Sequence, residues 1–223
     1  LVTGHLGRPG AGIFPLLTRG NEQGGYDMGM SPRMPFGQTD CADQAFSSRI
    51  TRLWKIKHLP SKDGIPLEAL PKAIKNHRIK AMYLMEADPC TESSAAAEFQ
   101  SSLKALDFLV VQDRFLTETA KQADLILPAP SWAEKAGTYT NTERRVQWQS
   151  RIINPLKQML AAWQVICAVG KKMGFQKQFS FGSPEAILSE INKAVPAYAG
   201  ITPSRVKKLD GIIAPCPATK HPG

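Results

Sequence analysis

The sequence predicts an α/β fold in which a Rossmann-like parallel sheet is flanked by helices. Short apolar runs at 81–85, 108–111 and 125–127 alternate with segments of helical periodicity. Runs that are apolar throughout are typical of parallel strands that are buried on both faces. Each run ends at polar residues or proline, and open α/β sheets bind ligands at the carboxyl ends of their strands. A chain of 223 residues is long enough to build such a sheet and its core.

Helical periodicity is found between and around these runs. The segments with apolar residues three or four positions apart are 43–53, 67–76, 94–105, 117–122, 160–173 and 184–194. The stripe expected on 160–173 consists of Trp163, Ile166, Val169 and Met173. The last two segments have plausible boundary signals, since Gly174 follows one and Pro184 begins the other.

The sequence divides into three predicted parts. Residues 1–40 contain many glycines and prolines and show little periodicity, which predicts an extended loop segment. Residues 41–211 contain the predicted strands and most of the helices, and form the α/β domain. Residues 212–223 are rich in proline and are predicted to be a linker without a core element, leading to a further domain.

Charge and hydropathy exclude some classes of function. The net charge is +9, but the basic residues are scattered in small groups without interleaved aromatic residues, so we expect no nucleic-acid binding. A solvated surface and a subunit docking surface both remain open as explanations for the charge. We find no apolar run of 18 residues and no signal peptide, and therefore expect no membrane span and a cytoplasmic location.

Neither a metal site nor a catalytic centre is predicted from the residue types. The four cysteines are far apart, and none forms the C-x-x-C pair that clusters thiolates around a metal ion. The four histidines are isolated in the sequence, and none accompanies a candidate nucleophile. We therefore predict no metal ligand and no catalytic residue in this chain.

Residues 21–29, NEQGGYDMG, form a polar loop with a high density of amide groups. Gly24 and its neighbouring glycines suit a tight turn. Asn21 and Gln23 each offer a donor and an acceptor, which suits recognition of a neutral heterocycle. An ordinary turn and a ligand-binding loop both remain open. The GRPGAG string at 7–12 is a weaker candidate for a phosphate loop, and a plain turn explains it better.

Gln112 and Asp113 follow the second apolar run. A carboxylate there could accept two hydrogen bonds from the edge of a guanine, each contributing about 1.5–3 kcal/mol. Alternatively, Asp113 could cap the short helix that follows it. The residues themselves do not decide between these two interpretations.

The string GTYTNTERRVQ at 137–147 gathers polar residues that include Thr140, Asn141, Glu143 and Arg144. They come shortly after the third predicted strand, where they could contact a ligand. A surface hairpin explains the same pattern equally well.

Four strings together resemble the catalytic subunit of formate dehydrogenases, within the wider family of molybdopterin oxidoreductases. They are QGGYDMG (23–29), VVQDRFLTETA (110–120), ADLILPAPSWAEKAGTYTNTERRVQ (123–147) and PAYAGI (196–201). Their order and spacing agree with the family over nearly the whole chain. Any one string alone would be a weaker indication.

The resemblance implies a bis-molybdopterin guanine dinucleotide cofactor with molybdenum or tungsten. It places the metal ligand and the iron–sulfur ligands outside this segment. The implied partners are the remaining domains of the catalytic subunit and iron–sulfur electron-transfer subunits. The residues expected to contact the cofactor are Asn21, Gln23, Gly24, Asp88, Gln112, Asp113 and Thr140.

Three positions depart from the pattern of the family. Glu86 stands where the family usually has glycine, and Glu92 where it commonly has serine or threonine. Leu17 stands where formate dehydrogenases usually have an arginine that can hold the substrate anion. Arg19 lies two residues further on and is our candidate for a substitute.

The intact enzyme is accordingly expected to oxidise formate to carbon dioxide and to pass electrons to iron–sulfur centres, while these 223 residues alone would be inactive. An alternative is the large iron–sulfur subunit of NADH dehydrogenase with a vestigial site. Another alternative is an interaction module without catalytic activity.

Overall fold

A computed structural model describes residues 2–5, 8–13, 15–17, 19–32, 37, 43–60, 62–156, 159–208 and 210–222. Cys41 and Gly7 of the GRPGAG string lie outside these residues. The chain forms two compact units, each assembled from separate stretches of sequence. Unit 1 comprises 1–62, 137–149 and 183–223, and unit 2 comprises 63–136 and 150–182. The predicted division at residues 40 and 211 stays a prediction.

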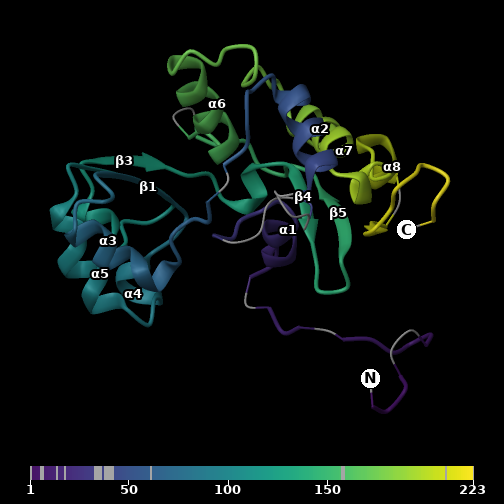
Figure 1. The fold of residues 1–223 in the computed structure, drawn as a ribbon, viewed down its shortest axis with the longest axis horizontal. Helices are drawn as coiled ribbons and strands as arrows, with labels where there is room; N and C mark the ends of the chain where they lie inside the picture. The colour runs from purple at the N-terminus through teal and green to yellow at the C-terminus, as the bar shows by residue number, and fades with distance from the viewer. Residues whose placement is uncertain are drawn as a thin grey trace. The chain divides into compact units, whose positions relative to one another are not determined.

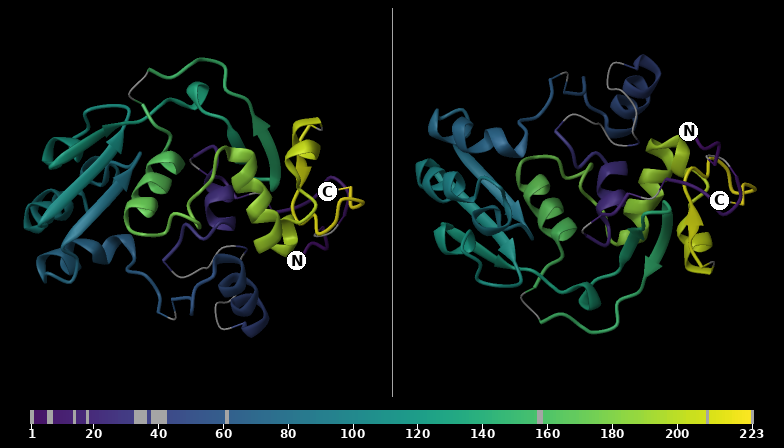
Figure 2. Two further views of the ribbon diagram at one scale, coloured as in Figure 1. Left: turned by 90° about the horizontal axis from the view of Figure 1, so that it is seen from above. Right: turned by 90° about the horizontal axis from the view of Figure 1, so that it is seen from below.

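Unit 2 contains the predicted parallel sheet. Its strands are β1 (Ala81–Met85), β2 (Phe108–Asp113) and β3 (Leu125–Pro128), in the order β1-β2-β3, and they lie side by side in Figure 2. The register places Val111 of β2 opposite Leu84 on one side and Ile126 on the other. All three predicted strands and their parallel direction are therefore confirmed.

Helices of unit 2 pack against one face of this sheet (Figure 1). They are α3 (Leu70–Lys75), α4 (Pro89–Glu92) and α5 (Ala96–Ser102), with 3-10 turns η2 (Leu67–Ala69), η3 (Leu103–Ala105) and η4 (Ala120–Gln122). The core beneath them consists of Ile74, Cys90, Phe99, Leu103, Leu109, Val111 and Ala120. Side chains alternate along a strand, so Gln112 faces away from this core while Val111 faces into it.

Two further elements complete unit 2. The 3-10 turn η5 (Trp132–Glu134) follows β3, and helix α6 (Ala162–Lys172) follows the segment around Leu160. On α6 the buried residues are Val165, Cys167 and Gly170.

Unit 1 is built around a hairpin and several helices. The helices are α1 (Glu22–Asp27), α2 (Gln44–Trp54), α7 (Pro184–Ala194) and α8 (Pro203–Lys208), with the 3-10 turn η6 (Pro196–Tyr198). The antiparallel strands are β4 (Gly137–Thr140), β5 (Arg145–Gln149) and β6 (Ile212–Ile213), in that order. The hairpin predicted as one alternative for 137–147 is thus present.

A side-chain cap explains where α2 begins. The Asp43 carboxylate accepts hydrogen bonds from the backbone N–H groups of Ala45 and Phe46, at 2.8 and 3.1 Å, and so starts α2. Phe46 and Ile50 lie one turn apart on the buried face of α2. The core of the unit consists of Phe46, Ile50, Val146, Leu188, Ala194, Val195, Tyr198, Ile201, Val206, Ile212, Ala214 and Cys216.

Two expectations about the ends of the chain are wrong in part. The segment 1–40 contains a helix, α1, in which Gly24 and Gly25 are buried. The segment 212–223 does contain core residues, since Ile212 pairs with Val146 in the sheet and Cys216 is fully buried. The role of 212–223 as a linker to another domain stays a prediction.

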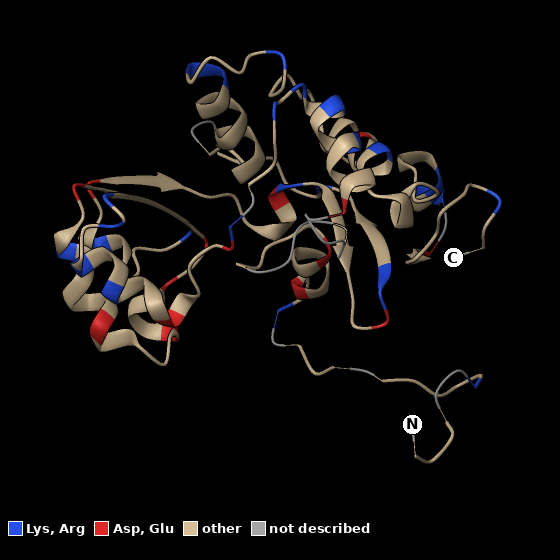
Figure 3. Ribbon diagram, viewed as in Figure 1, with Lys and Arg blue, Asp and Glu red and all other residues tan. Residues whose placement is uncertain are grey.

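The described cysteines form no cross-link, and basic residues occur in both units. Cys90, Cys167 and Cys216 are free and buried, and burial raises the pKa of the Cys90 thiol. Lysine and arginine are spread over the helices and loops of each unit (Figure 3). Of the helices described, none has the length and apolar character required to cross a bilayer.

Candidate cofactor-binding site

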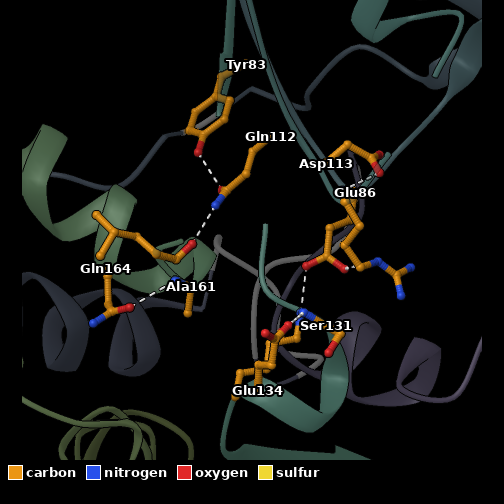
Figure 4. A network of polar contacts seen from close by, with 11 residues as sticks. Tyr83, Glu86, Gln112, Asp113, Ser131, Glu134, Ala161 and Gln164 are labelled. Carbon is orange, nitrogen blue, oxygen red and sulfur yellow. Dashed lines mark hydrogen bonds and ion pairs between the residues drawn. The ribbon is translucent and has the colours of Figure 1, made fainter. Parts of the chain in front are cut away.

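The carboxyl edge of the sheet in unit 2 carries three of the polar side chains expected from the sequence, Asp88, Gln112 and Asp113. The three strands run parallel and in register, so the segments that follow them leave from the same edge. Figure 4 shows the polar network on these segments, which includes Glu86, Asp113, Ser131 and Glu134. This is the edge at which open α/β sheets bind ligands.

Gln112 is 1% exposed and both ends of its amide have partners within the unit. Its Oε1 accepts a hydrogen bond from the Tyr83 hydroxyl at 2.7 Å, and its Nε2 donates to the Leu160 carbonyl at 2.8 Å (Figure 4). Burial raises the pKa of Tyr83, so the phenol remains a neutral donor. The structure therefore gives Gln112 a positioning role, because it ties β1 and β2 to the segment that precedes α6.

Asp113 ends β2 and stays partly exposed. Its Oδ1 accepts hydrogen bonds from the backbone N–H groups of Arg114 and Phe115, at 2.6 and 3.1 Å. The carboxylate thus caps the turn after the strand and not a helix, because η4 begins only at Ala120. The helix-cap interpretation is wrong in that form, and the guanine interpretation stays a prediction.

Asp88 lies after β1 and is held by Thr119. Its Oδ1 accepts hydrogen bonds from the Thr119 backbone N–H, at 3.1 Å, and from the Thr119 hydroxyl. Burial raises the pKa of Asp88, but the hydrogen bonds that its carboxylate accepts lower the pKa by more. The pKa of Asp88 therefore lies below its ordinary value. The Thr119 hydroxyl oxygen in turn accepts a hydrogen bond from the Cys90 N–H at 3.2 Å. Asp88 therefore joins the ends of two neighbouring segments.

Glu86 follows β1 in a left-handed backbone conformation, with φ of 49°. Its Oε1 lies 2.6 Å from the Lys135 Nζ, and its Oε2 lies 3.9 Å from the Arg114 Nε. Glycine adopts this backbone conformation without steric cost, whereas glutamate does not. The position that departs from the family's glycine is thus one where glycine would be favoured locally.

The turn η5, which precedes Lys135, is fixed by its own side chains. Glu134 accepts a hydrogen bond from the Ser131 backbone N–H at 2.7 Å (Figure 4). This bond and one from the Ser131 hydroxyl lower the pKa of Glu134. The backbone from which the Lys135 side chain extends is therefore held in place by this turn.

In unit 1, Asn21, Gly24 and Thr140 lie together. The Asn21 Oδ1 accepts a hydrogen bond from the Thr140 backbone N–H at 2.8 Å. A Cβ atom added to Gly24 would collide with Asn21 Oδ1 and lie 3.0 Å from Thr140 Oγ1. Glycine is therefore required by this close approach of α1 to β4.

The centre of the same region is Asp27, which is 1% exposed. It accepts hydrogen bonds from the Tyr198 hydroxyl at 2.6 Å and from the Gln23 Nε2 at 3.0 Å, and it lies 3.7 Å from the Arg144 guanidinium. Burial, followed by the hydrogen bond to Asp27 and its negative charge, raises the pKa of Tyr198 well above its ordinary value. The tyrosine is therefore a neutral donor at any physiological pH.

Arg144 lies in the hairpin turn with φ of 63°. Its Nε is buried, and no described residue accepts a hydrogen bond from that atom. Arg19, the candidate for substrate binding, lies in the turn just before α1 and is exposed.

The expected site residues therefore fall into two sets. Asp88, Gln112 and Asp113 belong to unit 2, while Arg19, Asn21, Gln23, Gly24 and Thr140 belong to unit 1. Sequence reasoning did not identify Tyr83, Lys135, Asp27 and Tyr198 as partners. Asp27 and Tyr198 are in strings that were noted, QGGYDMG and PAYAGI, but nothing in either string indicates that the two side chains meet.

Comparison with known proteins places these features in context. A sequence model of the family described as Molybdopterin oxidoreductase matches residues 1–172. The alpha subunit of an F420-dependent formate dehydrogenase from Methanocaldococcus jannaschii is 40% identical over 223 residues, which are all of this chain and 32% of that protein. The catalytic subunit of an assimilatory nitrate reductase from Bacillus subtilis is 33% identical over 229 aligned residues, again covering 32% of that protein. The chain thus spans about a third of the length of these relatives.

A solved structure also resembles the fold. Acetylene hydratase from Pelobacter acetylenicus superposes with a TM-score of 0.56 at 18% sequence identity, covering 76% of this chain and 24% of that one. At this level of identity the likeness concerns the fold alone.

Proposed function

Because the chain belongs to the molybdopterin oxidoreductase family, we propose that it forms part of a formate dehydrogenase catalytic subunit and holds the guanine end of the molybdopterin cofactor. The observation that carries this proposal is the carboxyl edge of the unit 2 sheet. There a partly exposed carboxylate, Asp113, lies on the same edge as two cations, Arg114 and Lys135.

The donor set fits a guanine dinucleotide. The Asp113 Oδ1 is used by the turn, and the second carboxylate oxygen is the acceptor that we assign to the ring N–H and amino groups of guanine. The two cations suit phosphoryl groups. When bound, the bis-molybdopterin guanine dinucleotide supplies two-electron redox chemistry at molybdenum or tungsten.

The other expected residues act through these groups. Gln112 and Asp88 position the strand ends, since both are engaged within unit 2. Asn21, Gln23, Gly24 and Thr140 fix the loop that carries Arg19, which we assign to the carboxylate of the substrate. Iron–sulfur partners and the rest of the catalytic subunit complete the proposed enzyme, so we expect the 223 residues alone to be inactive.

Identity of 40% to a formate dehydrogenase subunit over the whole chain favours this proposal over the large subunit of NADH dehydrogenase. A module without cofactor would need neither a carboxylate nor cations at the strand ends. Guanine nucleotide content of the purified intact subunit separates these alternatives.

The substitution Asp113→Asn in the intact subunit is expected to lower cofactor occupancy by about tenfold or more, because charge-assisted bonds of roughly 1.5–3 kcal/mol each are lost. The melting temperature of the cofactor-free subunit should change little, because asparagine keeps the oxygen that caps the turn. Occupancy is measured as guanine nucleotide and metal released per subunit. Asp107→Asn, at the amino end of the same strand, is the matched control. Full occupancy in Asp113→Asn would remove the proposed guanine contact.

A further inference from the structure

We propose that Lys135 and Arg114 form a phosphoryl-binding subsite, and that the Glu86 carboxylate occupies it as a competitor within the chain. The inference deepens the proposed function and rests on it, since it assigns the residues that would meet the phosphates of the dinucleotide. The ligand class is a pyrophosphate-bearing nucleotide.

The arrangement of the segments supports a ligand-binding role for these charges. Glu86 comes directly after β1, Arg114 directly after β2, and Lys135 directly after the turn that follows β3. Parallel strands in register bring these three segments to one edge. Two cations from neighbouring segments therefore converge on one carboxylate from the third, at distances of 2.6 and 3.9 Å.

The three side chains are accessible to solvent, so that a ligand could reach them. Their exposed fractions are 31% for Glu86, 26% for Lys135 and 42% for Arg114. An ion pair at such exposure contributes little to stability, because solvent screens it. A phosphoryl group, which carries more charge and more acceptor oxygens than a carboxylate, can therefore displace Glu86 at small cost.

The backbone at Glu86 gives a second, independent reason. A glutamate with φ of 49° is in a backbone conformation that glycine adopts more readily. Local backbone preference therefore does not explain why this position has a glutamate. Its side chain instead neutralises the two cations. Glu86 would thus raise the Kd of the site for an anionic ligand.

Calorimetric titration of the 223-residue chain with inorganic pyrophosphate tests this. Glu86→Gln keeps the size of the side chain and removes its charge, and should lower the Kd for pyrophosphate by about tenfold. Lys135→Ala should raise that Kd by a similar factor. In the double variant, the gain from Glu86→Gln should largely vanish, because both changes act on one interaction.

Two further variants serve as controls for the effect of Glu86→Gln. Glu118→Gln removes an acid from another lysine pair of unit 2, Glu118–Lys121, and should change the Kd less than twofold if the effect is local. Glu86→Gly suits the backbone conformation and should bind pyrophosphate at least as tightly as Glu86→Gln. A melting curve for each variant shows that it is folded.

Unchanged pyrophosphate affinity in Glu86→Gln, or in Lys135→Ala, overturns the subsite, as does an equal gain in Glu118→Gln. Titration with guanosine, which has no phosphate, separates this inference from the proposed function. If guanosine binding depends on Asp113 but pyrophosphate affinity is unchanged in Glu86→Gln, the guanine contact is supported and the phosphoryl subsite is contradicted. The reverse pattern keeps the subsite and removes the guanine contact.

Discussion

Replacing Asp27 with alanine is expected to lower the free energy of unfolding of unit 1 by about 2–4 kcal/mol, between the cost of one unsatisfied buried donor and that of breaking a fully buried ion pair. Asp27 is almost fully buried and receives hydrogen bonds from Tyr198 and Gln23. The variant would leave the buried Tyr198 hydroxyl without this acceptor and Arg144 without its anion. Arg144 is 37% exposed, so water would compensate part of the loss.

Urea denaturation followed by tryptophan fluorescence measures this effect. Trp54 and Trp148 pack against the core of unit 1, and replacing the other two tryptophans with phenylalanine isolates their signal. Glu22→Ala, at a partly exposed acid on the same helix α1, should change stability by no more than about 0.5 kcal/mol. A loss below about 1 kcal/mol in Asp27→Ala would show that the network adds little to the fold.

Arg19→Ala in the intact subunit is expected to lower kcat/KM for formate by roughly ten- to hundredfold, because a small carboxylate loses a partner worth about 1.5–3 kcal/mol. Arginine suits this role since its planar guanidinium binds a carboxylate through two parallel bonds. Leu17, at the position expected to hold the arginine, cannot donate a hydrogen bond. Arg19 is exposed in the turn that leads into α1. The backbone N–H of Glu22, the first residue of α1, donates a hydrogen bond to the Arg19 carbonyl at 3.2 Å.

The control for Arg19 is Arg8→Ala, an exposed arginine of the same segment, which should leave turnover unchanged. Leu17→Arg provides the complementary variant and should restore formate turnover in the Arg19→Ala background. If formate turnover is strong and is unchanged in Arg19→Ala, another part of the subunit must bind the formate anion. Weak turnover in the unmodified subunit would point to a different substrate.

Much of the secondary structure could be predicted because it depends on local patterns. The strands at 81–85, 108–111 and 125–127 are continuous apolar runs, and the helix at 184–194 begins with a proline, where the structure has it. Such signals need no knowledge of distant residues.

The stripe on 160–173 shows where such patterns fail. Ile166, Val169 and Met173 follow helical spacing, yet they are 40%, 47% and 70% exposed, and the neighbouring positions are buried instead. Periodicity identifies a helix, but the surface that packs depends on which elements surround it.

The candidate site was predicted as positions rather than as contacts. Gln112 and Asp88 do lie at strand ends, but each is engaged by a residue far away in sequence, Tyr83 and Leu160 for one and Thr119 for the other. Pairings over 29 to 48 residues leave no local signal. The ion pair between Glu86 and Lys135 was missed for the same reason.

The discontinuous make-up of the two units bears on the order in which they can form during synthesis. The chain passes from one unit to the other after residues 62, 136, 149 and 182. The sheet of unit 2 and its helical cover lie within 63–136, so a ribosome can release them in one stretch and they can collapse early. The core of unit 1 joins Phe46 and Val146 to Ile212 and Cys216, so it cannot close until the last part of the chain has emerged. Until then, the apolar faces of α2 and the hairpin stay open to solvent, and this interval is when the nascent chain is most exposed to aggregation.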